Sequence, residues 1–326
     1  MSASPNPTAE ALLPNDIDFL ALIRWARDQT LQRLFRPFRI ETWMILGFCA
    51  WLAGLGQNGF GFNFFGGSKQ SGPKTFNSET ISAWTATAKD FAQTNWVWLL
   101  PLVALVGLFL LALWVALIWI SSRGRFLFLE NLMTGRVEVA RPWREYAAEA
   151  QSLFWFRIWI AIAAMGFGLI CGGVGIFAAI SIQSHTAWNG VGIALMIAAL
   201  LLAVPLMILA AVAWVVLEQI VVPLMWLRRI LCLSAWTAGL HVIRMRPMLF
   251  FQFLVTRLIL AILTGIAVLA FALLTCCIGG ILMALPYLGA VILLPVTVFF
   301  RFLSVGYLAH FGSDYDLLAA GATRAP

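Results

Sequence analysis

The sequence predicts an all-α fold, a polytopic transmembrane helical bundle of six spans, from three observations. Of the 326 residues, 62% are hydrophobic and 11% are charged, whereas a soluble globular domain carries roughly 25% charged residues. The hydrophobic residues form long runs, and about 20 apolar residues of helix span the hydrocarbon core of a bilayer. The arginines lie mostly between these runs. A chain of this composition is expected to have lipid, and not water, around most of its surface.

The N-terminal lead, residues 1–39, is expected to lie in the cytoplasm and to carry one interfacial helix. This helix should run from Asp16 to Phe35, because the carboxylates of Asp16 and Asp18 suit the positive end of a helix dipole. Pro37 should end it, since proline has no N–H to donate. Its apolar residues do not share one face, which indicates a position at the membrane surface rather than in a core.

A transmembrane domain is expected over residues 40–309, followed by a cytoplasmic tail of residues 310–326. Its six predicted spans are, in order, about 40–57, 96–120, 154–182, 191–217, 249–276 and 287–309. The first span is short, and Trp43 and Trp51 are expected to anchor it at the membrane interface. Between the first two spans, apolar residues at helical spacing within 78–92 predict a second short helix on the membrane surface.

Charge and proline predict where the next two spans end. A mixed-charge cytoplasmic loop is expected over residues 123–153, after the second span ends at Ser121 and Ser122. The apolar run 191–227 has 37 residues. As one straight helix it would be about 55 Å long, against a bilayer core of about 30 Å. A kink between Glu218 and Pro223 is therefore expected, because proline removes a backbone hydrogen bond there.

The C-terminal third predicts a surface helix and two further spans. The basic segment 228–247 is expected to form a helix at the cytoplasmic face. Residues 249–300 are almost continuously apolar, which is long enough for two spans, and Pro286 marks the turn between them. Similar tripeptides also suggest three repeated helical hairpins, namely Phe-Arg-Ile at 38–40 and 156–158 and Arg-Leu-Ile at 257–259.

The arginines set the predicted orientation. Fourteen of the eighteen lie in the N-terminal lead before Arg39, which abuts the first span, in the 123–144 segment, in the 228–246 segment and in the tail. By the positive-inside rule these segments are cytoplasmic, so both termini lie inside and the number of spans is even. The predicted location is a bacterial inner (plasma) membrane, with membrane lipids as partners, including anionic headgroups at the cytoplasmic face. The net charge of +7 does not indicate nucleic acid, since the basic residues lie beside hydrophobic spans.

Four charged residues lie inside predicted spans and form the candidate site, Glu218, Arg257, Arg301 and Arg157. A charge at the bilayer centre costs at least ~2.5 kcal/mol, so such residues are usually paired or functional. Glu218 is expected to pair with Arg257 or Arg301, which lie at a similar depth. Two interpretations stay open. One is an ion pair that holds the bundle together, and the other is a cytoplasm-facing pocket for an anionic lipid head or solute.

No catalytic constellation, cofactor site or metal site is recognisable in the sequence. It has no G-x-x-x-x-G-K-[ST] phosphate loop and no H-E-x-x-H helix. The five cysteines lack metal-ligand spacing, and the three histidines are scattered along the chain. An enzyme is therefore not expected.

Three stretches resemble a diffuse group of uncharacterised bacterial multi-pass membrane proteins, a group similar to the membrane domain of some glycerophosphodiester phosphodiesterases. They are SSRGRFLFLENL with the following PWREY, EQIVVPLMWLRR with the following AW, and PVTVFFRFLSVGYLAHFGSDYDLL. Together they cover the cytoplasmic ends of most predicted spans. The resemblance implies a multi-helix membrane module and supplies no catalytic residues, and residues 1–326 contain no phosphodiesterase barrel.

The function expected from the sequence is a non-catalytic membrane scaffold or accessory module, whose basic cytoplasmic segments contact lipid heads or a protein partner. The alternative is a transporter, or a lipid- or anion-binding membrane protein, that uses the buried charges. Helices interrupted at Pro205, Pro223 and Pro286 favour this alternative, since discontinuous helices often line substrate sites. A water-accessible cavity at the charged residues would support it, whereas a closed, dry bundle would support the scaffold.

Overall fold

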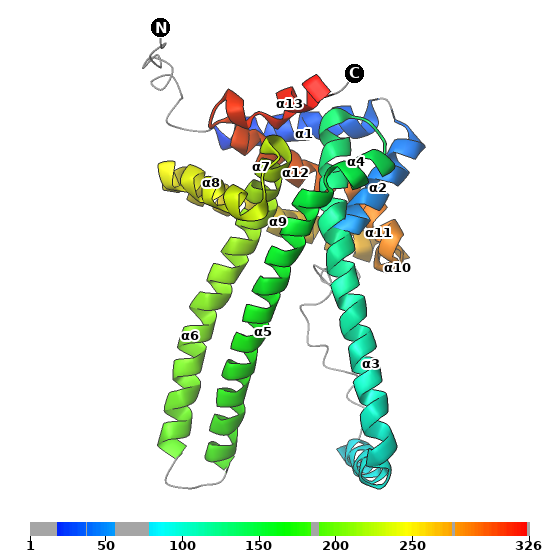
Figure 1. The fold of residues 1–326 in the computed structure, drawn as a ribbon, viewed down its shortest axis with the longest axis vertical. Coiled ribbons are helices and arrows are strands. Elements are labelled where there is room, and N and C mark those ends of the chain that lie inside the picture. The colour runs from blue at the N-terminus through cyan, green and yellow to red at the C-terminus, as the bar shows by residue number, and fades with distance from the viewer. Residues whose placement is uncertain (1–17, 37, 56–77, 184–188, 276–277, 325–326) are drawn as a thin grey trace.

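The structure, a computed structural model, describes residues 18–36, 38–55, 78–183, 189–275 and 278–324. Within these ranges the chain is almost entirely helical and has no strand, so the predicted all-α class is confirmed. Figure 1 shows a head of packed helices, from which long helices extend in roughly one direction. The predicted features that fall on Asp16 and on residues 56–57 lie outside the described residues.

The helices are numbered along the chain as in Figure 1. They are α1 (Phe19–Phe35), α2 (Ile40–Gly54), α3 (Ser78–Thr134), α4 (Ala140–Glu145), α5 (Ala147–Gln183), α6 (Asn189–Val216), the π-helical turn η3 (Leu217–Val221), α7 (Val222–Arg228), α8 (Cys232–Met245), α9 (Pro247–Leu274), α10 (Ile278–Ala284), α11 (Pro286–Ile292), α12 (Leu294–Ala309), the 3-10 turn η4 (Ser313–Tyr315) and α13 (Leu317–Arg324).

Four helical segments among the described residues are long and apolar enough to cross a membrane. They are Leu100–Thr134 in α3, Ala147–Ala178 in α5, Gly190–Arg228 from α6 to α7, and Pro247–Leu274 in α9. The helices that extend from the head are α3, α5 and α6, with α5 and α6 side by side (Figure 1). Their surface is apolar and highly exposed, with Leu105 at 66%, Leu169 at 71% and Leu201 at 69%. Such a surface suits lipid better than water.

The predicted count of six spans is not confirmed, because the first and last predicted spans fall on short helices. α2 has 15 residues and α12 has 16, which gives lengths of about 22 and 24 Å, against a bilayer core of about 30 Å. The predicted sixth span, 287–309, is divided at Leu293 between α11 and α12. Pro295 lies in the first turn of α12, where its missing N–H costs no helical hydrogen bond. The predicted three-hairpin repeat is likewise not confirmed.

The predicted loop over residues 123–153 is mostly helical in the structure. Residues up to Thr134 form the last turns of α3, α4 covers Ala140–Glu145, and α5 begins at Ala147. Ser121 and Ser122 do not end the helix, since their hydroxyls donate to backbone carbonyls at 2.8 Å. Residues 126–129 are each at most 1% exposed and lie in the core of the head. The separate surface helix predicted within 78–92 is also part of α3. Four of the polar residues that suggested a loop are instead buried, namely Ser121, Ser122, Arg125 and Glu130.

The sequence predicts a kink between Glu218 and Pro223, and the structure has the π-helical turn η3 at this place. Helix α6 passes through η3 into α7, and the N–H of Val222 donates to the carbonyl of Leu217, five residues earlier. Pro223 follows in the first turn of α7. The helix predicted next, within residues 228–247, is present as α8.

Both ends of the described chain pack onto the head. α1 begins after Asp18, whose carboxylate accepts the N–H groups of Leu20 at 3.0 Å and Ala21 at 3.2 Å. The sequence predicts no shared apolar face in α1, whereas Leu22 and Ala26 are buried and the helix packs against α12. The position of α1 at a membrane surface stays a prediction. α13 lies in the segment predicted as a tail and contacts α3 and α7.

Candidate functional site

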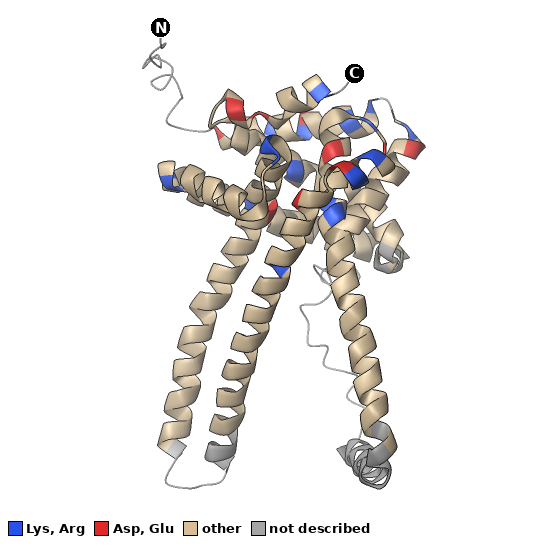
Figure 2. Ribbon diagram, in the orientation of Figure 1, with Lys and Arg blue, Asp and Glu red and all other residues tan. Residues whose placement is uncertain are grey.

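Charged side chains gather where the long helices join the head. Arg125 of α3, Glu218 of η3 and Arg301 of α12 meet there. Together with Arg157 of α5 and Arg257 of α9 they form what we call the arginine–glutamate cluster. Figure 2 shows the wider pattern, in which acidic and basic residues lie in the head and the extended parts of α3, α5 and α6 are almost free of them. The cluster therefore lies at the boundary between a charged region and an apolar one.

Glu218 is at the centre of the cluster and contacts two arginines. Its Oε1 accepts a hydrogen bond from Arg301 Nη2 at 2.8 Å, and its Oε2 lies 3.0 Å from Arg125 Nη1. Arg301 Nη1 also donates to the backbone carbonyl of Glu218 at 2.7 Å. One residue of η3 is thereby joined to both α3 and α12. Of the two partners left open by the sequence, Arg301 forms the ion pair.

The π-helical turn explains why the carbonyl of Glu218 is available to Arg301. In a continuous α-helix that carbonyl would accept the N–H of Val222, four residues later. Here the Val222 N–H goes to Leu217 instead, and the residue five positions after Glu218 is Pro223, which has no N–H. The turn thus presents the Glu218 carbonyl to Arg301 in the middle of a helix. π-helical turns are frequent at functional sites for this kind of reason.

Two arginines of the cluster lie against the ring of Trp214 in α6. The guanidinium carbons of Arg125 and Arg157 are 5.4 and 5.5 Å from the ring centroid, within the distance of about 6 Å at which cation–π attraction acts. Arg157 is 4% exposed. Its Nη1 lies 3.2 Å from the Ser121 hydroxyl and 3.1 Å from the Ser122 hydroxyl, to which it donates. The serines that suggested the end of a span therefore serve as acceptors for a buried cation.

Arg257 also lies close enough to Glu218 for an electrostatic interaction with its carboxylate. Its Nη1 is buried and has no hydrogen-bond partner among the described residues. Four arginines accompany one carboxylate, so the cluster carries an excess of positive charge. Three cavities in the described part of the chain are lined by residues outside the cluster. The described part of the chain also contains no group of three or more His, Cys, Asp or Glu side chains that could hold a metal ion.

Arg125 is the cluster residue that the sequence analysis missed. Its position after two serines assigned it to a cytoplasmic loop, yet its side chain is 0% exposed. The signal that could have found it is the spacing of Phe126, Leu129 and Met133, which continues an apolar helical face beyond Arg125.

A second buried carboxylate, Glu130, organises the interior of the head. It accepts hydrogen bonds from Tyr146 Oη at 2.7 Å, Trp226 Nε1 at 2.8 Å and Arg141 Nη2 at 2.9 Å. Burial first, and then the hydrogen bond to Glu130, raises the pKa of the Tyr146 phenol, which keeps it a donor. Arg324 of α13 donates to the Tyr146 hydroxyl and to the Trp226 carbonyl, each at 3.3 Å. These bonds fasten the C-terminal helix to the head.

Comparison with known proteins identifies a family and no activity. A protein-family model described as a family of unknown function (DUF7544) matches residues 20–312. No curated protein and no solved structure matches the chain. The expectation of an uncharacterised family is therefore confirmed, whereas none of these comparisons shows a resemblance to glycerophosphodiester phosphodiesterases. Since the match extends from the start of α1 to beyond the end of α12, the protein belongs to this family of unknown function, DUF7544.

Proposed function

We propose that this protein is a non-catalytic scaffold or accessory module of a bacterial inner (plasma) membrane. In this proposal the extended parts of α3, α5 and α6 lie in the bilayer, and the head lies at the cytoplasmic face with both termini on that side. The basic residues of the head contact anionic lipid headgroups. The rest of the head surface is available to a protein partner.

The observation that carries the proposal is the separation of charge from apolar surface along the molecule (Figure 2). Basic residues are retained on the cytoplasmic side of membrane proteins, which supports a cytoplasmic head. The arginine–glutamate cluster joins three elements at the boundary by an ion pair and hydrogen bonds within the protein. A role in holding the long helices to the head needs no ligand at that cluster.

Thiol labelling in spheroplasts of an expression host tests the orientation. Gly190→Cys at the start of α6 and Ser313→Cys in η4 place probes in the two regions, in a background with the five native cysteines replaced. We expect a membrane-impermeant maleimide to label Gly190→Cys directly and Ser313→Cys only after the membrane is permeabilised. The reverse pattern would overturn the orientation. Labelling of both variants without permeabilisation would overturn the membrane placement.

A second candidate is an anion-binding or anion-transporting membrane protein. It is favoured by the excess of positive charge in the cluster, where Arg125, Arg157, Arg257 and Arg301 accompany the single carboxylate of Glu218. In this case Glu218→Gln should fold normally and change anion flux in proteoliposomes. The scaffold proposal expects the same variant to lose stability, so flux and thermal unfolding of one variant separate the two candidates.

A further inference from the structure

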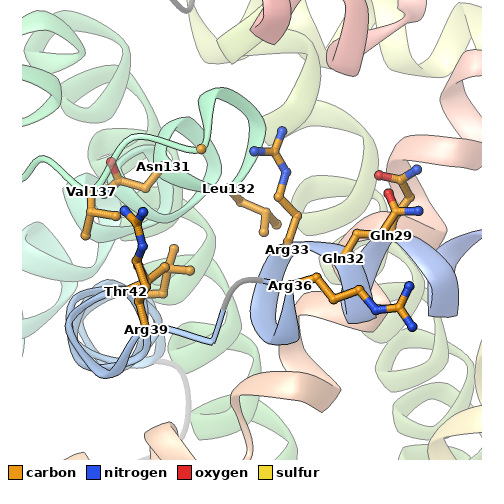
Figure 3. A pocket seen from close by; sticks show the side chains of 11 residues that line it. Gln29, Gln32, Arg33, Arg36, Arg39, Thr42, Asn131, Leu132 and Val137 are labelled. Atoms are coloured by element: carbon orange, nitrogen blue, oxygen red, sulfur yellow. The ribbon is translucent and has the colours of Figure 1, made fainter.

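A cavity at the corner between α1 and α2 lies apart from the arginine–glutamate cluster. Its volume is about 470 Å³, within the range of roughly 300–1,000 Å³ that small-molecule sites occupy. Its walls come from the end of α1, the start of α2 and the end of α3. Figure 3 shows Arg33 and Arg39 pointing the same way, toward the chain at the end of α3, and Arg36 pointing away from Arg39 on the side of Gln32.

Hydrogen-bond donors line this cavity, and none of its described lining residues is acidic. The polar lining residues are Gln29, Gln32, Arg33, Arg36, Arg39, Thr42 and Asn131. Glu41, next to Thr42 in the sequence, is not among the lining residues. Three guanidinium groups without a lining carboxylate make the cavity electropositive, which suits an anion and excludes a cation.

The three arginines differ in the hydrogen bonds and ion pairs that they form within the protein. Arg33 Nη2 donates to the carbonyl of Met133 at 2.9 Å, where it caps the end of α3. Arg36 and Arg39 are exposed and have no carboxylate within ion-pair distance among the described residues. Arg27, in the α1 helix that ends just before Arg36, is by contrast paired with Asp28 at 3.0 Å. Arg36 and Arg39 are therefore the donors left for a ligand.

A hydrogen bond joins the two helices beside the cavity, and the rim there is apolar. The indole N–H of Trp43 donates to the carbonyl of Leu34 at 2.8 Å, which ties α2 to the end of α1. The rings of Phe35 and Phe38 lie 5.4 and 5.6 Å from that of Trp43. Phe38 is 58% exposed and Ile40 is 67% exposed. Arginines beside exposed aromatic and aliphatic side chains are typical of surfaces at the level of lipid headgroups.

We infer that this cavity binds a phosphate-bearing anionic group, with the headgroup of an anionic phospholipid as the source that the apolar rim favours. Guanidinium groups bind phosphate oxygens through charge-assisted and often paired hydrogen bonds. Arg39 and Arg36 hold the phosphate, and the exposed side chain of Arg36 turns toward it on binding. Phe38 and Ile40 contact the start of the acyl chains. The inference rests on the proposed function, because it needs the head to lie at a membrane surface.

The test uses the full chain in nanodiscs of neutral phosphatidylcholine, with binding of short-chain phosphatidic acid measured by equilibrium titration. The test variant is Arg36→Gln with Arg39→Gln, which leaves the structural Arg33 in place. The matched control is Arg24→Gln with Arg27→Gln, which removes the same charge from α1 outside the cavity. We expect the test variant to bind about 100-fold more weakly, at about tenfold for each guanidinium group removed from the phosphate. The control should bind like wild type, and all three proteins should melt alike.

Competition identifies the source of the phosphate. Inorganic phosphate that displaces the lipid at millimolar concentration would assign the site to a free phosphorylated solute, and failure to displace would assign it to the lipid. Unchanged binding by the test variant, an equal loss in the control variant, or equal binding of short-chain phosphatidylcholine would overturn the site. The labelling experiment above does not involve these arginines. An outward-facing head together with a loss of binding in the test variant would therefore reject the orientation and keep the site.

Discussion

At the scale of the residue, Glu218 shows how a largely buried carboxylate, with 15% of its side chain exposed, is tolerated beside a long apolar helix. Both carboxylate oxygens and the backbone carbonyl face arginine nitrogens, at 2.8, 3.0 and 2.7 Å. The same carboxylate offsets the charge of Arg125, whose side chain is 0% exposed. Removing one member of a buried ion pair is costly, because the partner stays behind as an uncompensated charge.

Replacement of Glu218 by Gln is the prediction at this scale. The amide keeps the shape of the side chain and leaves Arg125 and Arg301 without a counter-charge. We expect the free energy of unfolding to fall by about 3–5 kcal/mol, as for other broken buried pairs. Thermal unfolding in detergent measures the loss, with Glu138→Gln as control, since the Glu138 side chain is 49% exposed and its pair with Arg141 lies at the surface. Equal melting of Glu218→Gln and wild type would reject the structural role of the cluster.

At the scale of the element, α3 is the helix on which the head is assembled. Its last turns carry the core residues 126–129, the buried Arg125 and the buried Glu130. It meets α2 at Gly124, where an added Cβ would lie 2.7 Å from the backbone N of Ala53 and 2.7 Å from the backbone C of Leu52. Only a residue without a side chain allows the two helix backbones to approach so closely.

We expect that replacing Gly124 destabilises the protein, because a side chain there disrupts the contact between α2 and α3. In Gly124→Ala the methyl group would meet backbone rather than a movable side chain, so the helices must separate. Overpacking of this kind costs about 1–3 kcal/mol. The matched control is Gly107→Ala on the same helix, where nothing lies within 4 Å of the added atom. We expect a lower melting temperature for Gly124→Ala only, and equal melting of both variants would contradict the close contact.

The element scale also shows where prediction from sequence ends. The helical character of α1, α5, α6, α8 and α9 follows from apolar runs, caps and charge, which are properties of neighbouring residues. The continuation of α3 beyond Ser122 does not follow from neighbouring residues. Taken alone, Ser121, Ser122 and Arg125 indicate the end of a membrane span, and only their contacts in the folded chain show that the helix continues. The acceptor of the Ser121 hydroxyl lies in α2, 68 residues away in the sequence.

At the scale of the whole molecule, the charged head and the apolar long helices require different solvents. Leu169 in the extended part of α5 is 71% exposed, and Leu20 in α1 of the head is 64% exposed. In water both positions would accept a polar side chain at little cost. In a bilayer only Leu20 in the head could be replaced by a polar side chain at little cost. An arginine near the centre of a span, as at Leu169, costs about 2.5–3.5 kcal/mol by insertion measurements.

A pair of arginine substitutions tests this difference. We expect Leu169→Arg to reduce the amount of protein recovered in the membrane fraction and Leu20→Arg to leave it unchanged. Quantitative blotting of membrane and soluble fractions measures both variants against wild type. Recovery of Leu169→Arg in the membrane at the wild-type level would argue against lipid around α5.

Composition and the order of charges along the chain were sufficient to predict an all-α protein with apolar helices compatible with a membrane, and to select Glu218 and Arg301 as buried charges. These predictions succeed because hydrophobic runs and isolated charges are visible in a short window of sequence. The inclusion of Arg125, the use of Ser121 and Ser122 as acceptors, and the short lengths of α2 and α12 required the folded chain. Each depends on contacts between elements far apart in the sequence, such as the 83 residues that separate Glu218 from Arg301. Local pattern shows that a charge needs a partner, and packing alone decides which partner reaches it.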